Sequence, residues 1–160
     1  MKKVLAILFV AVMVGVMAVG FSAPALADTT ANLITDGRDN PTDIGDLSVT
    51  YVPGTFTVTY TIDPLTDWEI VETHVYIGNG APAKSSPGKF LYVAGDINFT
   101  PSGSTVCIAA HAEVRMIIGF DIDQNPIYAY ESVWAQTGSD TPIGKGANWA
   151  TYFVFTLPLP

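Results

Sequence analysis

The feature that most constrains this chain is an alternation of polar and apolar residues near residues 47–62. From residue 55 to 62 a threonine occupies every second position, and Phe56, Val58, Tyr60 and Ile62 fill the positions between. Successive side chains of a strand point to opposite faces, so a period of two predicts strands rather than helices. Together with the turn residues Pro53-Gly54, the pattern predicts a β-hairpin of residues 47–52 and 55–62 that buries its apolar face.

The rest of the chain repeats this organisation, with β-prone segments separated by stretches rich in Gly, Pro and Ser. No segment combines a period of 3.6 with helix caps. We therefore predict an all-β chain that forms a single antiparallel β-sandwich, jelly-roll or immunoglobulin-like, over residues 28–160. The further predicted strands are residues 68–77, 90–93, 97–100, 105–120 (bent near 116–119), 127–135 and 148–157.

The N-terminus has the pattern of an export signal. Met1-Lys2-Lys3 precedes an unbroken apolar run over residues 4–21, and small residues at Ala25 and Ala27 stand before Asp28. This predicts a secretory signal peptide, residues 1–27, that is cleaved after Ala27. An uncleaved membrane anchor is the alternative, because the apolar run approaches the length of a membrane span. The mature domain is predicted to be secreted, extracellular or periplasmic, and free of the membrane after cleavage.

Net charge excludes some classes of partner. The chain has 7 Lys and Arg against 15 Asp and Glu. Cleavage after Ala27 removes two lysines and no acidic residue, which leaves 133 residues with 5 basic and 15 acidic side chains, a net charge of −10. So acidic a domain is unsuited to nucleic acid or to anionic lipid, because both are bound through Lys and Arg. The single cysteine, Cys107, cannot form an internal disulfide, and we expect it to be a small buried residue.

Both histidines have a glutamate two positions away, in Glu72-Thr-His74 and His111-Ala-Glu113. Residues i and i+2 of a strand share a face, so the four side chains would converge if the two strands were neighbours. Imidazole and carboxylate are ligands for Zn²⁺ or another divalent ion. A hydrogen-bonded polar cluster without metal is the alternative interpretation of the same pattern.

Two acidic segments resemble calcium sites only in part. Asp121-x-Asp123-x-Asn125 copies the start of a calcium loop, but proline and serine occupy the positions that need glycine and glutamate. A hairpin turn is the better interpretation of this segment. The acidic stretch at residues 36–46 could bind extracellular Ca²⁺ weakly, or could be an ordinary solvated loop.

Five short motifs follow one another along the chain and together resemble a recurrent domain of secreted and cell-surface proteins of bacteria and archaea. That domain has no assigned activity, so the resemblance implies an exported β domain and no reaction. The motifs are Trp68-x-Ile70-x-Glu72-Thr73-His74, Pro87-Gly88-Lys89-Phe90, Ile108-Ala109-Ala110-His111-Ala112, Glu131-Ser132-x-Trp134-Ala135 and Gly146-x-Asn148-Trp149-Ala150-Thr151-Tyr152-Phe153.

The sequence lacks the serine-nucleophile motif G-x-S-x-G, a nucleotide-binding loop and a basic patch. We therefore expect an exported, non-enzymatic domain that binds or assembles at the cell surface, with a glycan, a protein or its own copies as partner. Trp68, Trp134 and Trp149 could stack on a sugar or fill the core.

Two other functions remain open from the sequence. The first is a self-assembling fibre or matrix subunit, in which edge strands pair between copies. The second is a metal-binding domain, or a metal-dependent enzyme in which a glutamate of the two Glu/His pairs acts as general base.

Overall fold

The computed structural model describes residues 26–35, 41–144 and 149–158, and the following statements concern those residues. They form strands and one short 3-10 turn, and no helix among them is long and apolar enough to cross a membrane. Most of the predicted signal peptide, residues 1–25, lies outside the described residues. The elements are β1 (Ala27–Thr35), β2 (Asp43–Val52), β3 (Thr55–Ile62), β4 (Glu69–Gly78), η1 (Pro87–Lys89), β5 (Gly95–Asn98), β6 (Thr105–Phe120), β7 (Pro126–Gln136), β8 (Thr141–Pro142) and β9 (Thr151–Thr156).

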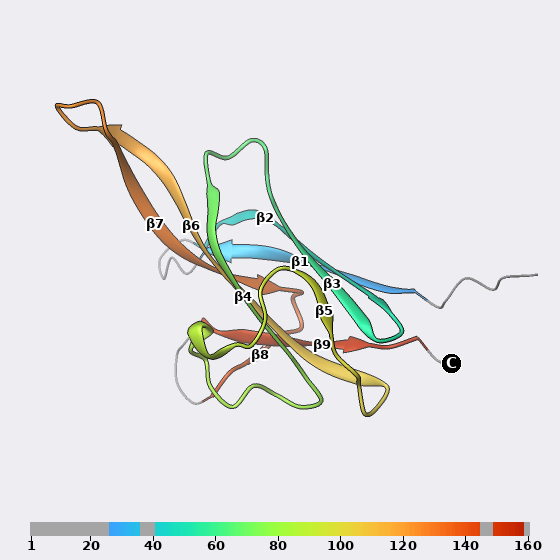
Figure 1. Cartoon of the computed structure of the whole chain (residues 1–160). Coiled ribbons are helices and arrows are strands. Elements are labelled where there is room, and N and C mark those ends of the chain that lie inside the picture. The colour runs from blue at the N-terminus through green and yellow to red at the C-terminus, as the bar shows by residue number, and fades with distance from the viewer. Residues whose placement is uncertain (1–25, 36–40, 145–148, 159–160) are drawn as a thin grey trace, which may run out of the picture.

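The strands pair antiparallel in the order β5-β3-β2-β1-β7-β6-β9-β8, and β4 pairs with β6 (Figure 1). The sheet folds over on itself, because Phe56 of β3 packs against Phe155 of β9, with ring centroids 5.7 Å apart, although four strands separate β3 from β9 in this order. The predicted all-β, antiparallel class is confirmed, and the folded sheet is consistent with a β-sandwich.

Apolar side chains form two clusters, one on each side of β6. Even-numbered residues of β6 from Val106 to Val114 enter the main core between the layers, and Ala109 belongs to a smaller cluster on the other side with Trp134, Ile143 and Ala150. Because several side chains of this strand are small, other residues can pack closely on both of its sides. The fully buried members of the main core include Leu33, Ile44, Leu47, Val49, Phe56, Val75, Ile108, Val114 and Val133.

β6 is paired along both of its edges. One edge pairs with β4, from Cys107↔Gly78 to Arg115↔Glu69. The other edge pairs first with β9 and then, from His111 onward, with β7. β6 therefore joins three strands and fixes their relative positions.

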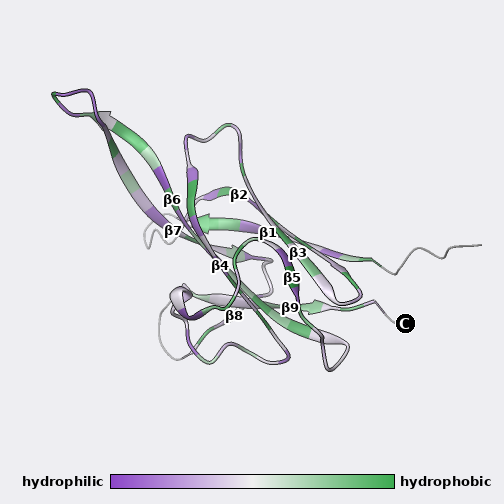
Figure 2. Ribbon diagram, viewed as in Figure 1, coloured by the Kyte–Doolittle hydropathy of each residue, from purple (hydrophilic) through white to green (hydrophobic). Residues whose placement is uncertain are grey.

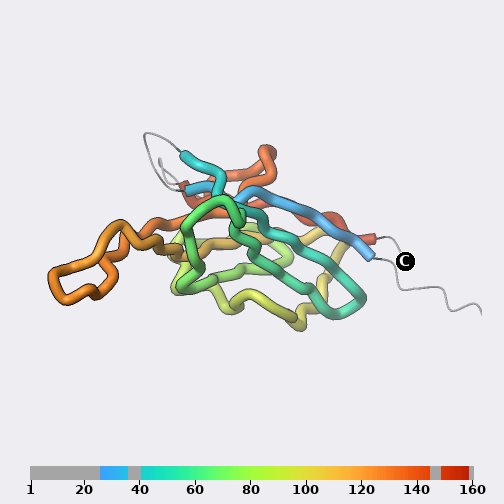
Figure 3. Tube along the Cα trace, turned by 90° about the horizontal axis from the view of Figure 1, so that it is seen from above, coloured from blue at the N-terminus to red at the C-terminus, as the bar shows by residue number. Residues whose placement is uncertain are grey.

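β6 and β7 continue past the rest of the sheet as a two-stranded ribbon, which projects from the body in two perpendicular views (Figures 1 and 3). We call residues 116–130 the arm. Its ladder runs from Met116↔Ala129 to Phe120↔Pro126, and its register shifts between Ile117 and Gly119, which leaves Ile118 without a counterpart on β7. The predicted bend near residues 116–119 corresponds to this bulge. The start of β1 and the end of β9 lie together at the opposite end of the molecule.

Most predicted strands are present, and the hairpin of β2 and β3 has its expected turn and faces. Three expectations need correction. Residues 90–93 contain only an isolated bridge, Val75↔Tyr92, and no strand. β1 was not predicted, because its buried positions, Ala31, Leu33 and Thr35, include only one large apolar residue. Cys107 is partly exposed rather than buried, and the burial it does have raises the pKa of its thiol.

Replacing Phe56 by alanine should lower the free energy of unfolding by about 3–5 kcal/mol, because the ring is fully buried against Phe155. Phe120→Ala, the matched control, removes the same group from an exposed position in the arm and should change stability by less than about 0.5 kcal/mol. Urea denaturation followed by tryptophan fluorescence measures both values. Equal losses for the two variants would contradict the placement of the core.

Candidate functional site

The face of β4, β6 and β7 that points away from the main core carries most of the polar groups singled out in the sequence. We call it the outer face. Cross-strand register places His74 opposite His111 and Glu72 opposite Glu113. On the other edge of β6, Trp134 lies opposite His111. The condition for convergence of the two Glu/His pairs is therefore met: their strands are direct neighbours.

The outer face exists because β6 alternates regularly over its paired length. Val106, Ile108 and Val114 enter the main core, so the odd-numbered positions between them, including His111 and Glu113, face the other way. β4 follows the same rule, with Val75 in the core and His74 on the outer face. A period of two thus sorts the two histidines onto one surface.

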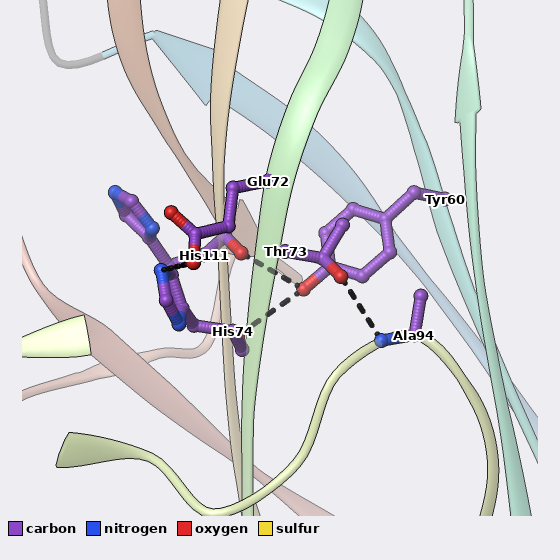
Figure 4. A network of polar contacts seen from close by, with 6 residues as sticks. All are labelled: Tyr60, Glu72, Thr73, His74, Ala94 and His111. Carbon is purple, nitrogen blue, oxygen red and sulfur yellow. Dashed lines mark hydrogen bonds and ion pairs between the residues drawn. The ribbon is translucent and has the colours of Figure 1, made fainter. Parts of the chain in front are cut away.

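Tyr60 of β3 ties the opposite layer to the strands that carry the histidines (Figure 4). Its hydroxyl lies 3.3 Å from the carbonyl oxygen of His74 and 3.1 Å from that of His111, and donates toward both. Burial raises the pKa of this hydroxyl far above its ordinary value, so it stays protonated and able to donate. The contact holds β3 against both histidine strands at the level of the candidate site.

His111 is enclosed by aromatic rings. Its imidazole packs edge-on against Trp134, at 5.0 Å between ring centroids, and lies 5.7 Å from the ring of His74. The residue is 7% exposed, and its Nδ1 has no hydrogen-bond partner among the described residues. Burial, with a smaller contribution from the nearby His74, lowers the pKa of His111 to about 4, so the ring is neutral at pH 7.

His74 and the two glutamates are more accessible. The His74 Nε2 atom lies 3.4 Å from Glu72 Oε1, and Glu72 is exposed. Glu72 and Glu113 face each other across the β4–β6 ladder, an arrangement that costs free energy when both are ionised. Among the described residues, no three or more His, Cys, Asp or Glu side chains are placed to hold a metal ion.

The segment Asp121-x-Asp123-x-Asn125, at the tip of the arm, is a turn, as its departures from the calcium pattern predict. The Asp121 carboxylate accepts hydrogen bonds from the backbone N–H groups of Asp123 and Asn125, and from the Asn125 side chain. These bonds lower the pKa of Asp121 and use its oxygens within the turn. In the other acidic stretch, residues 36–40 lie outside the described residues.

The three tryptophans do not form an exposed stacking platform. Trp134 is buried, and Trp68 and Trp149 are half-buried against the two apolar clusters. Their role as core residues, which the sequence left open, is the one that the structure supports.

The arm is a feature that the sequence analysis did not recognise as a functional element. Ile117, Ile118 and Phe120 are 49%, 59% and 59% exposed, and Ile122 at the tip is 95% exposed. The apolar stretch of β6 beyond the body is visible in Figure 2. The uncharged run of residues 116–120 could have indicated an exposed apolar surface. An apolar run in a long predicted strand is, however, usually interpreted as part of the core.

Arg115 marks the base of the arm. It forms an ion pair with Glu69 through Nε, and its guanidinium carbon lies 4.3 Å from the centre of the Tyr128 ring. A hollow of about 480 Å³ opens here beside the first residues of the arm. Its lining residues are Asp67, Glu69, Arg115, Met116, Ile117 and Tyr128.

Comparison of the chain with protein-family models, with curated proteins and with solved structures found no match. Function is therefore argued from the geometry of this chain.

Tyr60→Phe should lower the free energy of unfolding by about 1 kcal/mol, because it removes a buried hydrogen-bond donor and keeps the ring. Tyr92→Phe is the control, since Tyr92 is a half-buried tyrosine that contacts Val75 through backbone hydrogen bonds. Chemical denaturation of both variants measures the difference. A loss no larger for Tyr60→Phe than for Tyr92→Phe would show that the hydroxyl does not hold the layers together.

His111 should make the fold sensitive to acid. The unfolded side chain takes up a proton near pH 6.5, whereas the folded one does so only near pH 4, so stability falls as the pH drops between these values. The loss amounts to about 3 kcal/mol at its limit. His111→Phe, which keeps a ring against Trp134, should lack this component. The test compares unfolding free energies of the two proteins from pH 7.5 to 4; parallel curves would contradict the burial of a neutral imidazole.

Proposed function

We propose that this protein is an exported, non-enzymatic β domain that binds at the cell surface through its arm. The proposal includes cleavage of residues 1–27, a fold of the jelly-roll or immunoglobulin-like kind, and a protein, a glycan or another copy as the partner. The observation that carries it is the arm: a two-stranded ribbon with several large apolar side chains in solvent.

The arm by itself is expected to be only marginally stable. A two-stranded ribbon is marginal in water unless further strands or another layer cover it. Among the described residues, the arm has no third strand beyond the Glu69↔Arg115 pair of the β4–β6 ladder. Exposure of adjacent apolar side chains to water is also unfavourable, and a partner that covers them lowers the free energy. Binding to a partner would cover the apolar side chains of the ribbon and stabilise it.

The outer face supports binding rather than catalysis. Its buried histidine is neutral and packed between aromatic rings, and its carboxylates lie on an open surface. A second hollow, of about 280 Å³, is shallow and is lined by Glu113, Tyr130, Glu131 and Ser132. These groups offer hydrogen bonds and an aromatic ring, which suits contact with a polar partner beside the apolar arm.

The arm also has a suitable position. β1 starts at the opposite end of the molecule (Figures 1 and 3). Export through the N-terminus, whether or not the signal is cleaved, therefore leaves the arm at the far end from the segment that enters the membrane.

Fractionation of the cells that produce the protein tests the proposal. The wild-type chain should be retained at the cell surface, whereas the double variant Ile117→Ser/Phe120→Ser should appear mainly in the medium. The control, Leu91→Ser/Val93→Ser, removes two exposed apolar side chains outside the arm and should be retained. Wild-type protein confined to the cytosol, or equal release of both double variants, would contradict the proposal.

Mass spectrometry of the exported protein tests cleavage. We expect a chain that begins at Asp28, within β1. The remaining strand still pairs with β2, from Asp28↔Thr50 onward, so removal of Ala27 costs little structure. An exported chain that begins at Met1 would show that the segment is retained as an anchor.

A second candidate function is binding of Zn²⁺ or another divalent ion by Glu72, His74, His111 and Glu113. The observation that favours it is the register that puts the two histidines opposite each other and the two glutamates opposite each other. Binding would require the side chains to move, since they are not preassembled for a metal. Equilibrium dialysis against Zn²⁺ with elemental analysis should then give one bound ion, lost in His74→Ala; no bound ion would reject this candidate.

A further inference from the structure

The edges of the sheet differ in how they are protected against pairing with other chains. Natural edge strands are kept short, carry charge or proline, or are covered. In the body, β5 has four residues and contains Asp96, and β8 has two residues and ends in a proline. The outer edge of β4 is covered by the bridge from Val75 to Tyr92 and by a hydrogen bond from Ala94 N–H to Thr73 Oγ1.

The other uncovered edges of the body follow the same rule. β1 carries Asp28 in its segment beyond β7, and the free ends of β3 and β9 are four residues long each. The free edge of β7, residues 126–132, starts at Pro126 in the arm and carries Glu131 just beyond it. Short, charged or proline-bearing edges offer little to a second strand.

The β6 edge of the arm has fewer of these protections. Beyond Arg115, β6 has β7 on one side and no described strand on the other. Its residues 116–120 read Met-Ile-Ile-Gly-Phe, with neither charge nor proline, and three of the five side chains are large, apolar and about half exposed or more. The bulge at Ile118 is the one protective feature, and it limits the length over which a second strand can pair.

We propose that the β6 edges of two copies pair antiparallel about a two-fold axis near Ile118, so that two arms form one four-stranded sheet. This inference rests on the proposed function of the arm and names its partner as a second copy of the chain. Pairing supplies the additional strands that a lone ribbon lacks. It also lets the exposed isoleucines of each arm pack against the other arm.

Charge disfavours a parallel arrangement of the two arms. The arm and its base residue Arg115 contain one cation, at the base, and two anions, Asp121 and Asp123, at the tip. With the axis near Ile118, the acidic tip of each arm lies toward the base of the other arm, where Glu69 already pairs with Arg115. Parallel arms would instead bring the two tips together, with like charges adjacent.

The assembly closes on itself. A two-fold contact uses the same surface on both copies and leaves no further β6 edge free. Because the body edges are short, charged or covered, we expect a dimer and no fibre. The high negative charge of the domain also disfavours contacts between copies elsewhere on the surface.

Sedimentation velocity of the exported protein from 1 to 300 μM tests self-pairing. The wild type should change from monomer to dimer with concentration, and the control Leu91→Lys should do the same. Ile118→Lys should remain monomeric throughout, with an unchanged circular dichroism spectrum. A wild type that stays monomeric, or that grows beyond a dimer, would overturn the proposal.

Cysteine cross-linking tests the register. In a Cys107→Ser background, Ile118→Cys places two thiols across the axis, where Cα atoms of opposed residues lie about 4.5–5.5 Å apart and a disulfide can form. Ile122→Cys, more exposed, lies about 27 Å from its symmetry mate along the strands. Oxidation should therefore cross-link Ile118→Cys far faster. Equal rates, or no cross-link at position 118, would overturn the two-fold arrangement.

The outcomes separate this inference from the proposed function. A monomeric protein that still needs Ile117 and Phe120 for retention at the cell surface would remove the second copy as partner and keep the arm as a binding element. A dimer whose retention is unaffected by those substitutions would keep the pairing and remove its role at the surface.

Discussion

The structure depends on β6 being paired along both edges. Between residues 106 and 114 this strand supplies the main core with one face and the outer face with the other, and three strands take their positions from it. Its central residues Ala109, Ala110 and Ala112 are buried and small, so a layer can approach each side. Larger side chains at these positions would push the layers apart, at a cost typical of overpacked cores.

The same strand determines where the polar groups of the outer face lie. Regular alternation sends His111 and Glu113 to the outer face, and the register with β4 places His74 and Glu72 opposite them. The Tyr60 hydroxyl then fixes both histidine strands to the other layer through their carbonyl groups. A neutral, buried His111 is therefore a packing residue that lowers stability in acid, whereas Glu72 and the apolar side chains of the arm are exposed to solvent.

Local pattern was sufficient for much of this fold. Threonine alternation predicted the β2–β3 hairpin, and Gly/Pro stretches predicted most strand limits, because both act through neighbouring residues. Strand adjacency was not predictable, since the β4–β6 pairing joins residues about forty positions apart. β1 is not predictable from its sequence because its inward positions are mostly small or polar. The exposure of the arm is not predictable either, because burial of residues 116–120 depends on where the rest of the sheet ends.

Amide hydrogen exchange tests most directly whether the arm lacks a neighbouring strand along its β6 edge. In dilute exported protein, amides of residues 116–120 should exchange much faster than those of residues 108–114 in the same strand, because only the latter are paired on both edges. At high concentration the arm amides of β6 should become protected while those of β5 stay unchanged. Arm amides that are as well protected in dilute solution as the centre of β6 would show that this edge is already paired.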